Sequence, residues 1–284
     1  MMDARTAILA EDRYITVDGL NIRYIERGEG PAAIFMHGAS LGSSADVFQR
    51  NLGPLAEAGI RAIAYDHPGF GLSDNPTDFS VAARRDMTPK LIDALGLGRA
   101  ALIPHSQSGG MAVQLVLEAP DRYSHLIAIG TGGLLPPLEG AGEDPGTPPQ
   151  ERAGQPATED EPSLEFARQQ LVATTFDTAL VTEEEVASRH ARSIGKNFEA
   201  HIARAKAGGT GAPATPIWQR LAGIEIPFVL LIGREDRANA FERAELLRRR
   251  YPELDIRIAA NCKHMVPWDA AEEVAKVAIS TILS

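Results

Sequence analysis

The feature that most restricts the fold is a series of short apolar runs separated by helical patterns. The runs are apolar at nearly every position and occupy 32–37, 61–66, 100–105, 125–130, 227–233 and 255–260. Strands need this composition when helices cover both faces of their sheet, because neither face meets water. Helical periodicity fills the intervals, at 45–58, 79–95, 109–119, 239–250 and 268–283. This alternation predicts an α/β fold, with a mostly parallel sheet between two layers of helices.

Two earlier runs differ from these because their polarity alternates. They occupy 13–17 and 21–27 and flank Asp18-Gly19, a dipeptide typical of a tight hairpin turn. Alternation indicates one buried and one exposed face, as at the edge of a sheet. We therefore predict an antiparallel hairpin that extends the sheet to eight strands.

The alternation of strands and helices stops between Gly130 and Pro227. Residues 136–162 are rich in Pro, Gly, Ala and acids, which predicts a loop with partial disorder. Residues 163–207 are helical in pattern, and Thr182 followed by Glu185 has the spacing of a capping box. A helical insertion here would cover the carboxyl ends of the strands, where open α/β sheets hold ligands. We predict a lid or cap at 134–215 and a core domain formed by 1–133 and 216–284.

Composition narrows the range of partners. The 284 residues are 44% apolar, enough to bury a large core, and carry a net charge of −10 without a basic cluster. Nucleic acid is excluded as a partner, since binding it needs clustered Lys and Arg. We find no signal-peptide core near the N-terminus, no membrane-spanning run, and a single cysteine, Cys262. We expect a cytoplasmic protein that acts on a small molecule away from membranes, and we leave a homodimer open.

Residues 102–120 have the pattern of a strand, a tight turn and a helix. Such a turn can carry a nucleophilic serine above the sheet, with small residues two positions to either side. Two registers compete. Ser108 has the better local flanks, Ser106 and Gly110, whereas the apolar run ends at the residue just before Ser106.

A serine hydroxyl becomes a strong nucleophile only when a base removes its proton, and a carboxylate must orient that base. The run at 227–233 ends in Gly233 and is followed by two acids, Glu235 and Asp236. His264 lies in the loop after the last run, at 255–260. An acid and a histidine following late strands, in this order, predict the rest of a catalytic triad.

These motifs resemble the α/β-hydrolase superfamily, whose elbow reads Gly-His-Ser-x-Gly-Gly before a helix ending in Glu-x-Pro. The match of His105-Ser106, with Glu118-Ala119-Pro120 at the expected distance, implies that Ser106 is the nucleophile. The resemblance also implies Asp236 as the orienting acid and an oxyanion hole formed by the backbone N–H groups of Ala39 and Gln107. In the same superfamily the positions of His37, His67 and Ser73 belong to the scaffold.

Within the superfamily the chain is most similar to the meta-cleavage-product hydrolases, which cleave a C–C bond in ring-fission dienones. The similarity is carried by 43–76 and by 176–190. It implies that Arg189 binds the substrate's carboxylate; the alternative is a surface ion pair with Glu185, four residues earlier. Further expected substrate contacts follow the same comparison: Gly38, His105, Met265 and Trp268. The chain departs from the family at 104–105, at Met265 and in the loop 37–42.

The predicted activity is therefore that of a serine hydrolase that attacks a carbonyl of a small organic substrate. The substrate is either a carboxylic ester or lactone, or a dienone cleaved at a C–C bond. Two alternatives stay open: a cofactor-independent dioxygenase of the same fold, which often keeps His-Ser at the elbow, and a non-catalytic binding protein. We expect no metal and no cofactor, because neither metal-ligand spacings nor a Gly-x-Gly-x-x-Gly motif occur.

Overall fold

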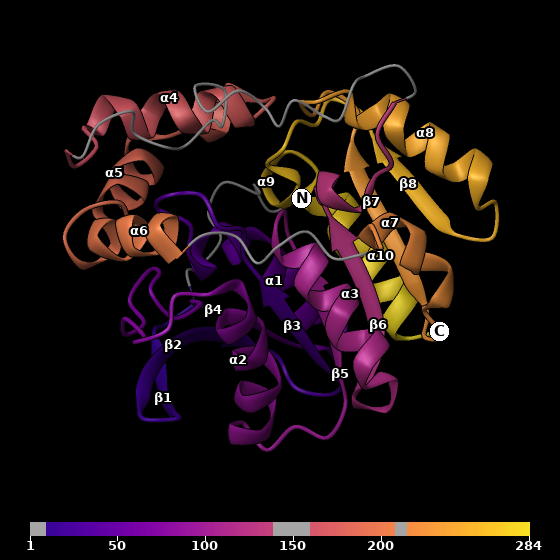
Figure 1. Cartoon of the computed structure of the whole chain (residues 1–284), viewed down its shortest axis with the longest axis horizontal. Helices are drawn as coiled ribbons and strands as arrows, with labels where there is room; N and C mark the ends of the chain where they lie inside the picture. Colours follow the sequence, from indigo (N-terminus) through magenta and orange to yellow (C-terminus); the bar gives the residue numbers. More distant parts are fainter. Residues whose placement is uncertain (1–9, 139–159, 208–214) are drawn as a thin grey trace.

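The computed structural model describes residues 10–138, 160–207 and 215–284. Within these residues, eight strands form one sheet in the order β1-β2-β4-β3-β5-β6-β7-β8 (Figure 1). The strands are β1 (Arg13–Val17), β2 (Leu20–Arg27), β3 (Ala32–Met36), β4 (Arg61–Tyr65), β5 (Ala100–Pro104), β6 (Tyr123–Ile129), β7 (Phe228–Gly233) and β8 (Asp255–Ala259). Pairing is antiparallel from β1 through β2 to β4 and parallel from β4 onward. The predicted eight-stranded, mostly parallel sheet is confirmed.

The predicted hairpin at the sheet edge is also confirmed. β1 and β2 pair in antiparallel register, with Val17 opposite Leu20. Asp18 and Gly19 between them have φ of 50° and 79°. Two consecutive residues with positive φ are what the favoured two-residue hairpin turn requires, because its twist matches that of the strands.

Helices cover both faces of the sheet (Figure 1). One layer contains α1 (Gln49–Glu57) and α10 (Ala271–Ile282), and the other contains α2 (Val81–Ala94), α3 (Ser108–Glu118) and α8 (Ala240–Arg250). Neighbouring residues of β3 show the division, since Ile34 packs with the second layer and Phe35 with the first, both fully buried. Each such side chain contributes about 1.5–3 kcal/mol by leaving water.

Short helical segments connect these elements. They are η1 (Ala45–Phe48), η2 (Pro120–Arg122), η3 (Gly132–Leu134), α7 (Ile217–Arg220), η5 (Leu221–Gly223) and α9 (Val266–Asp269). The helix predicted at 268–283 is therefore wrong at its start, because α9 and α10 are separate and Ala270 between them has φ of −123°.

A helical layer lies between β6 and β7 in the chain and stands above one part of the core (Figure 1). Its described elements are α4 (Leu164–Thr174), η4 (Thr178–Leu180), α5 (Glu183–Ala191) and α6 (Lys196–Ala207). The Thr182 hydroxyl accepts a hydrogen bond from the backbone N–H of Glu185 at 3.2 Å, so α5 begins at the predicted cap. Most of the predicted loop, 139–159, lies outside the described residues, and the domain boundaries at 134 and 215 stay a prediction.

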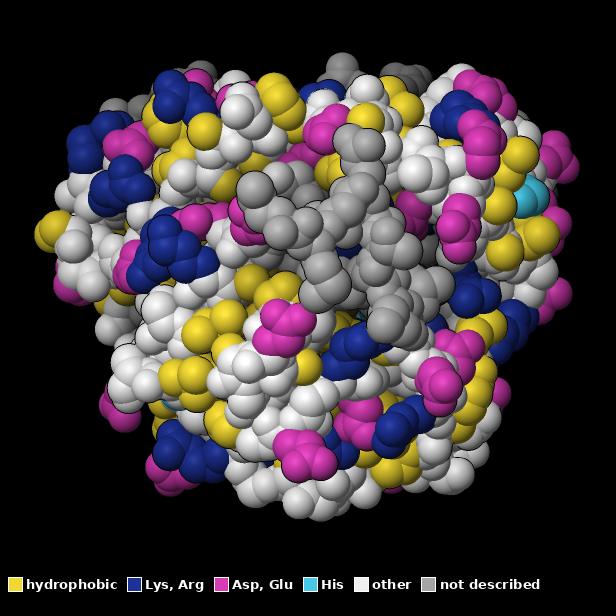
Figure 2. Space-filling view, turned by 180° about the vertical axis from the view of Figure 1, so that it is seen from behind, with side chains coloured by type: hydrophobic (Ala, Val, Ile, Leu, Met, Phe, Trp, Pro, Cys, Tyr) yellow, Lys and Arg dark blue, Asp and Glu magenta, His cyan; other side chains and the backbone are white. Residues whose placement is uncertain are grey.

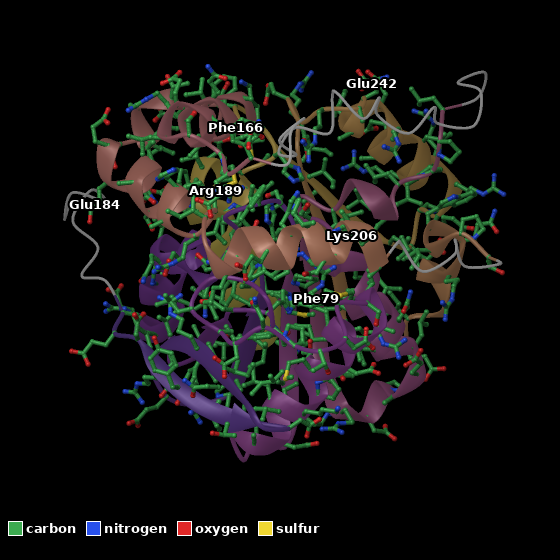
Figure 3. The ribbon with its side chains drawn as sticks, turned by 60° about the vertical axis from the view of Figure 1, so that its left-hand side comes forward. Phe79, Phe166, Glu184, Arg189, Lys206 and Glu242 are labelled. Atoms are coloured by element: carbon green, nitrogen blue, oxygen red, sulfur yellow. The ribbon has the colours of Figure 1, made fainter. Side chains whose placement is uncertain are left out.

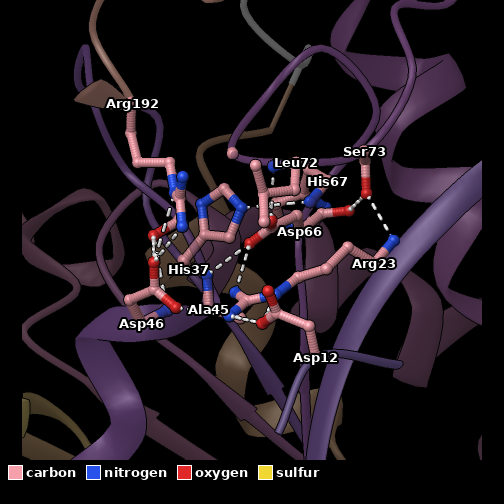
Figure 4. Close-up of polar contacts among 12 residues, drawn as sticks. Asp12, Arg23, His37, Ala45, Asp46, Asp66, His67, Leu72, Ser73 and Arg192 are labelled. Carbon is pink, nitrogen blue, oxygen red and sulfur yellow. Dashed lines mark hydrogen bonds and ion pairs between the residues drawn. The ribbon is translucent and has the colours of Figure 1, made fainter. Parts of the chain in front are cut away.

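A buried ionic network ties this layer to the core (Figure 4). The guanidinium of Arg23 lies 2.5 Å from Asp12, 2.6 Å from Asp46 and 3.4 Å from Asp66. Burial opposes the charge on Arg23, but the attraction of Asp66 and Asp46 prevails and raises its pKa. Asp46 also pairs with Arg192, just beyond α5, at 3.3 Å. One carboxylate thus joins a core strand to the helical layer.

The surface mixes both signs of charge. Seen from behind, acidic side chains are interspersed with Lys and Arg (Figure 2), as expected for a moderately acidic protein. Over the described part of the chain, no helix is long and apolar enough to cross a membrane.

Candidate active site

A strained turn joins β5 to α3 and carries Ser106. The residue has φ of 57°, in the left-handed region, which costs on the order of 1–3 kcal/mol for a residue with a side chain. Gly38 packs against it, and a Cβ added to this glycine would lie 3.0 Å from the Cβ of Ser106. The turn therefore lifts the serine hydroxyl above the strand end, and a side chain at position 38 would pack tightly against it.

Three side chains from the ends of three strands meet at this turn. His264 Nε2 lies 3.0 Å from Ser106 Oγ, and His264 Nδ1 lies 3.1 Å from Asp236 Oδ2. Burial works against ionisation of Asp236, but the hydrogen bond and charge of His264 outweigh it and lower the pKa of the carboxyl. A buried carboxylate held in this way can fix the orientation of the imidazole and stabilise it when protonated.

Ser108 occupies a different environment. It is the first residue of α3 and is buried, and its hydroxyl donates a hydrogen bond to the backbone carbonyl of His37. Its oxygen also lies 3.2 Å from Nε2 of His67. The structure therefore places Ser108 behind the turn, in contact with scaffold residues, and places Ser106 beside His264.

Glu235 likewise points away from the histidine. Its carboxylate accepts a hydrogen bond from the backbone N–H of Cys262 at 2.8 Å. This bond holds the loop that carries His264. The two adjacent acids thus have separate contacts, Asp236 with the imidazole and Glu235 with the loop backbone.

Two backbone N–H groups belong to the residues that directly follow Ser106 and Gly38, the glycine that packs against this serine. Within the described residues, the N–H groups of Ala39 and Gln107 donate to no protein acceptor. Both lie in loops at the carboxyl ends of strands, after β3 and β5. Unpaired donors at such a site suit a developing negative oxygen, and losing one typically costs about 10²–10³ in rate.

The pocket above Ser106 has one wall from the core and one from α4 and α5. Its lining includes His37, Gly38, Ser40, Ser43, Val47, His105, Gln170, Leu171, Thr174, Arg189, Arg237, His264 and Met265. In this conformation the pocket has a volume of about 30 Å³. Sites for small molecules usually measure roughly 300–1,000 Å³, so the pocket is narrower in this conformation than a typical ligand site.

Arg189 projects from α5 toward this pocket rather than pairing along its own helix. Figure 3 shows it on the inner side of the helical layer, with Glu184 at the outer edge. One guanidinium nitrogen donates to Ser40 Oγ at 2.9 Å, whereas Glu185 pairs with Arg50 at 3.3 Å. Burial lowers the pKa of Arg189 to about 10. Among the described residues no carboxylate pairs with this guanidinium.

Of the other residues predicted to contact the substrate, some line this pocket and one does not. His105 is buried, lines the pocket, and its Nε2 lies 2.9 Å from the backbone oxygen of His264; burial lowers the pKa of His105 to about 3. Met265 lines the pocket and its backbone N–H donates to Thr174 on α4. Trp268 lines a neighbouring hollow instead, where its indole N–H donates to the carbonyl of Val47 at 3.1 Å.

The sequence reasoning missed several pocket residues, among them Ser40, Gln170, Thr174 and Arg237. Ser40 had a local signal, because it follows the His-Gly pair in the loop after β3. The other three had none, since their positions depend on how α4 and the loop after β7 fold over the strand ends. Within the described residues, no group of three or more His, Cys, Asp or Glu side chains is arranged to hold a metal ion.

Comparison with known proteins agrees with this fold. Residues 31–271 match the α/β hydrolase fold family, so the chain belongs to that family and is a hydrolase. It is 31% identical to a 2-hydroxy-6-oxo-6-phenylhexa-2,4-dienoate hydrolase of Comamonas testosteroni over 265 residues, 91% of this chain and 90% of the relative. It is 29% identical to a 2-hydroxy-6-oxononadienedioate/2-hydroxy-6-oxononatrienedioate hydrolase of Burkholderia vietnamiensis, with 95% of each chain covered.

Solved structures show the same fold. A meta-cleavage product hydrolase from Pseudomonas fluorescens IP01 superposes with a TM-score of 0.75 at 21% identity, covering 95% of this chain and 97% of that one. A serine hydrolase involved in carbazole degradation superposes with a TM-score of 0.75 at 18% identity, covering 96% and 99%. The similarity to meta-cleavage-product hydrolases inferred from the sequence is confirmed by the named relatives.

Proposed function

We propose that this chain hydrolyses a C–C bond next to a ketone in a ring-fission dienone that carries a carboxylate. The observation that carries the proposal is the position of Arg189, a partly buried guanidinium without a described carboxylate partner in the same pocket as Ser106 and His264. A guanidinium fork binds a carboxylate through two charge-assisted hydrogen bonds. The names of the relatives, all hydrolases of hydroxy-oxo-dienoates, support this substrate class.

In the first half of the reaction His264 removes the proton of Ser106 as the oxygen attacks the ketone carbon. The carbonyl oxygen becomes negative and accepts hydrogen bonds from the N–H groups of Ala39 and Gln107. The dienone reacts as its 2-keto tautomer, in which the proton of the 2-hydroxyl has moved to C5 and made that carbon tetrahedral. Collapse of the intermediate then breaks the C5–C6 bond, and the electron pair passes into the conjugated keto acid to give a dienolate. The imidazolium returns its proton to the leaving fragment, and the acyl group stays on Ser106.

In the second half a water molecule takes the place of the leaving fragment. His264 removes its proton, the hydroxide attacks the acyl carbon, and the proton then returns to Ser106 as the carboxylic acid leaves. Asp236 stabilises the imidazolium formed in each half. Water is the only co-reactant, and one C–C bond is exchanged for a C–OH and a C–H bond. The helices of 134–215 serve as the lid that excludes bulk water during both halves.

The test uses 2-hydroxy-6-oxo-6-phenylhexa-2,4-dienoate and follows the loss of its visible absorbance. The wild type and Ser108→Ala should consume it, whereas Ser106→Ala should lose activity by about 10⁴-fold or more. Melting temperatures show whether each variant is folded. Turnover of p-nitrophenyl acetate without any turnover of the dienone would replace C–C hydrolysis with ester hydrolysis. Consumption of dioxygen would indicate the dioxygenase alternative.

A further inference from the structure

Two more arginines lie close together away from the catalytic pocket. Arg84 on α2 is buried, with 7% of its surface exposed, and Arg204 on α6 is partly buried. Their guanidinium carbons lie 5.5 Å and 3.7 Å from the centre of the Phe70 ring. Two positive charges thus share one aromatic ring in the interior of the protein.

The hydrogen bonds of these two groups are few. Arg84 donates to the side-chain oxygen of Gln107, and its Nε is buried without a partner. Arg204 donates to the backbone oxygen of Gly69 at 2.7 Å. In the described ranges no carboxylate forms an ion pair with either of them, although each guanidinium offers five N–H donors.

Burying such groups is unfavourable, because a guanidinium stays charged and loses its hydration. Desolvation lowers the pKa of Arg84 to about 10 and, together with the charge of Arg84, that of Arg204 to about 9. Arg23 offers a contrast within the same molecule, since three carboxylates surround it. The pair at Phe70 therefore lacks the carboxylate partners that Arg23 has.

A cavity of about 540 Å³ adjoins both arginines. Apolar side chains contribute to its lining, among them Leu20, Pro68, Phe79 and Met87. Figure 3 shows Phe79 beneath α6, the helix that carries Arg204. The volume falls within the range of roughly 300–1,000 Å³ that is usual for small-molecule sites.

Acidic residues also line the cavity, but they are exposed and have other partners. Asp18 pairs with Lys90 at 2.5 Å, and Asp86 pairs with Arg85 at 2.8 Å. Asp78 is exposed and accepts a hydrogen bond from the backbone N–H of Ser80. The buried charge of the cavity is therefore positive, and two of its three lining carboxylates form ion pairs.

We propose that this cavity is a second ligand site, which binds a small organic carboxylate with an apolar body. The carboxylate pairs with Arg84 and Arg204, and the apolar body contacts Phe79 and Met87. Neither arginine lines the pocket that contains Ser106, so the site is separate from the catalytic one and does not depend on the reaction proposed above. Gln107 connects the two sites, because its side-chain oxygen accepts a hydrogen bond from Arg84 and it directly follows Ser106 in the chain.

The experiment measures the binding of benzoate to the full-length protein by isothermal titration calorimetry, with benzamide and inorganic phosphate as comparison probes. Benzoate should bind the wild type, and benzamide should bind at least about tenfold more weakly because it lacks the charge. Arg204→Gln should weaken benzoate at least about tenfold, which corresponds to about 1.4 kcal/mol. Lys206→Gln is the matched control, since it removes an exposed positive charge from the same helix and should leave the affinity unchanged.

Two further variants locate the binding. Ala82→Trp places a large side chain at an exposed, cavity-lining position of α2 and should abolish binding to this cavity without touching an arginine. Arg189→Gln removes the guanidinium of the catalytic pocket, so the benzoate that this variant still binds is bound at the second site. The proposal is overturned if benzoate fails to bind, or if Arg189→Gln weakens it and Arg204→Gln and Ala82→Trp do not. Phosphate binding as tight as benzoate would overturn the organic-carboxylate assignment. Melting temperatures within a few degrees of the wild type confirm that each variant is folded.

Discussion

The two walls of the proposed catalytic pocket are built in different ways. On the core side, Ser106, Asp236 and His264 follow β5, β7 and β8, whose buried register fixes where each strand ends. On the other side, Leu171 and Arg189 stand on α4 and α5. Buried apolar residues of these two helices pack with Met265 and Trp268 in a small cluster distinct from the two that flank the sheet. The core wall thus holds the groups proposed to do the chemistry, and the helical wall holds the group proposed to select the substrate. Substitutions on the two walls should therefore change different kinetic constants.

The largest expected effect is on the core wall. Asp236→Asn should lower kcat by about 10⁴-fold, because the amide cannot stabilise the imidazolium and favours the wrong tautomer of His264. KM should change little. Steady-state assays of the dienone check this. Glu235→Gln is the matched control: its amide oxygen can still accept from the N–H of Cys262, so kcat should stay within a few fold. Equal losses in both variants would refute the assignment of Asp236.

Arg189→Gln tests the helical wall. The KM for a carboxylate-bearing dienone should rise by about 10- to 100-fold, since charge-assisted hydrogen bonds contribute about 1.5–3 kcal/mol. The KM for the neutral ester p-nitrophenyl acetate should hardly change. Arg50→Gln removes a nearby arginine that pairs with Glu185, and serves as the control. If Arg189→Gln impairs both substrates equally, the guanidinium has no special role toward the carboxylate.

The difference between the core wall and the helical wall also explains which parts of the site could be predicted from the sequence. The elbow at 102–120 and the strand end at Gly233 could be predicted, because the hydrophobic pattern and the turn are local, and the end of the last strand was predicted one residue too late. The position of Arg189 could not, because spacing along a helix allows a pair with Glu185 and gives no sign that Arg50, distant in the chain, takes that acid. Arg84 and Arg204 were overlooked for the same reason, since their proximity arises only when α2 and α6 meet at Phe70.

The ionic network that joins the core to the helical layer should stabilise the fold in a pH-dependent way, because it contains the carboxyl group of Asp46. Burial raises the pKa of this carboxyl, but Arg23 and Arg192 outweigh burial and lower it below its usual value. The carboxylate therefore stabilises the fold above the unfolded pKa of about 3.9, and this contribution is lost as the pH falls through the folded value. Urea unfolding should show Asp46→Asn less stable than the wild type at pH 7 by about 1–3 kcal/mol, with a smaller difference at pH 3.

Asp121→Asn, at an exposed acid, is the control for this comparison and should be nearly neutral at both pH values. A difference between Asp46→Asn and the wild type that stayed constant from pH 7 to pH 3 would show that the charge of Asp46 is not what matters.

The smallest effect is expected from Arg192→Gln, which removes only the helical-wall half of the same network. The pair with Asp46 is long, at 3.3 Å, and both side chains are 21% exposed, so its loss should cost at most about 1 kcal/mol. Asp46 keeps its contact with Arg23, and the free energy of global unfolding should hardly change. Hydrogen exchange should instead accelerate in 183–191 and stay unchanged in the central strands, because only the tether of α5 is weakened. Faster exchange in β3 and β5 as well would mean that the two walls open as one unit, and that chemistry and substrate selection are not separable in this fold.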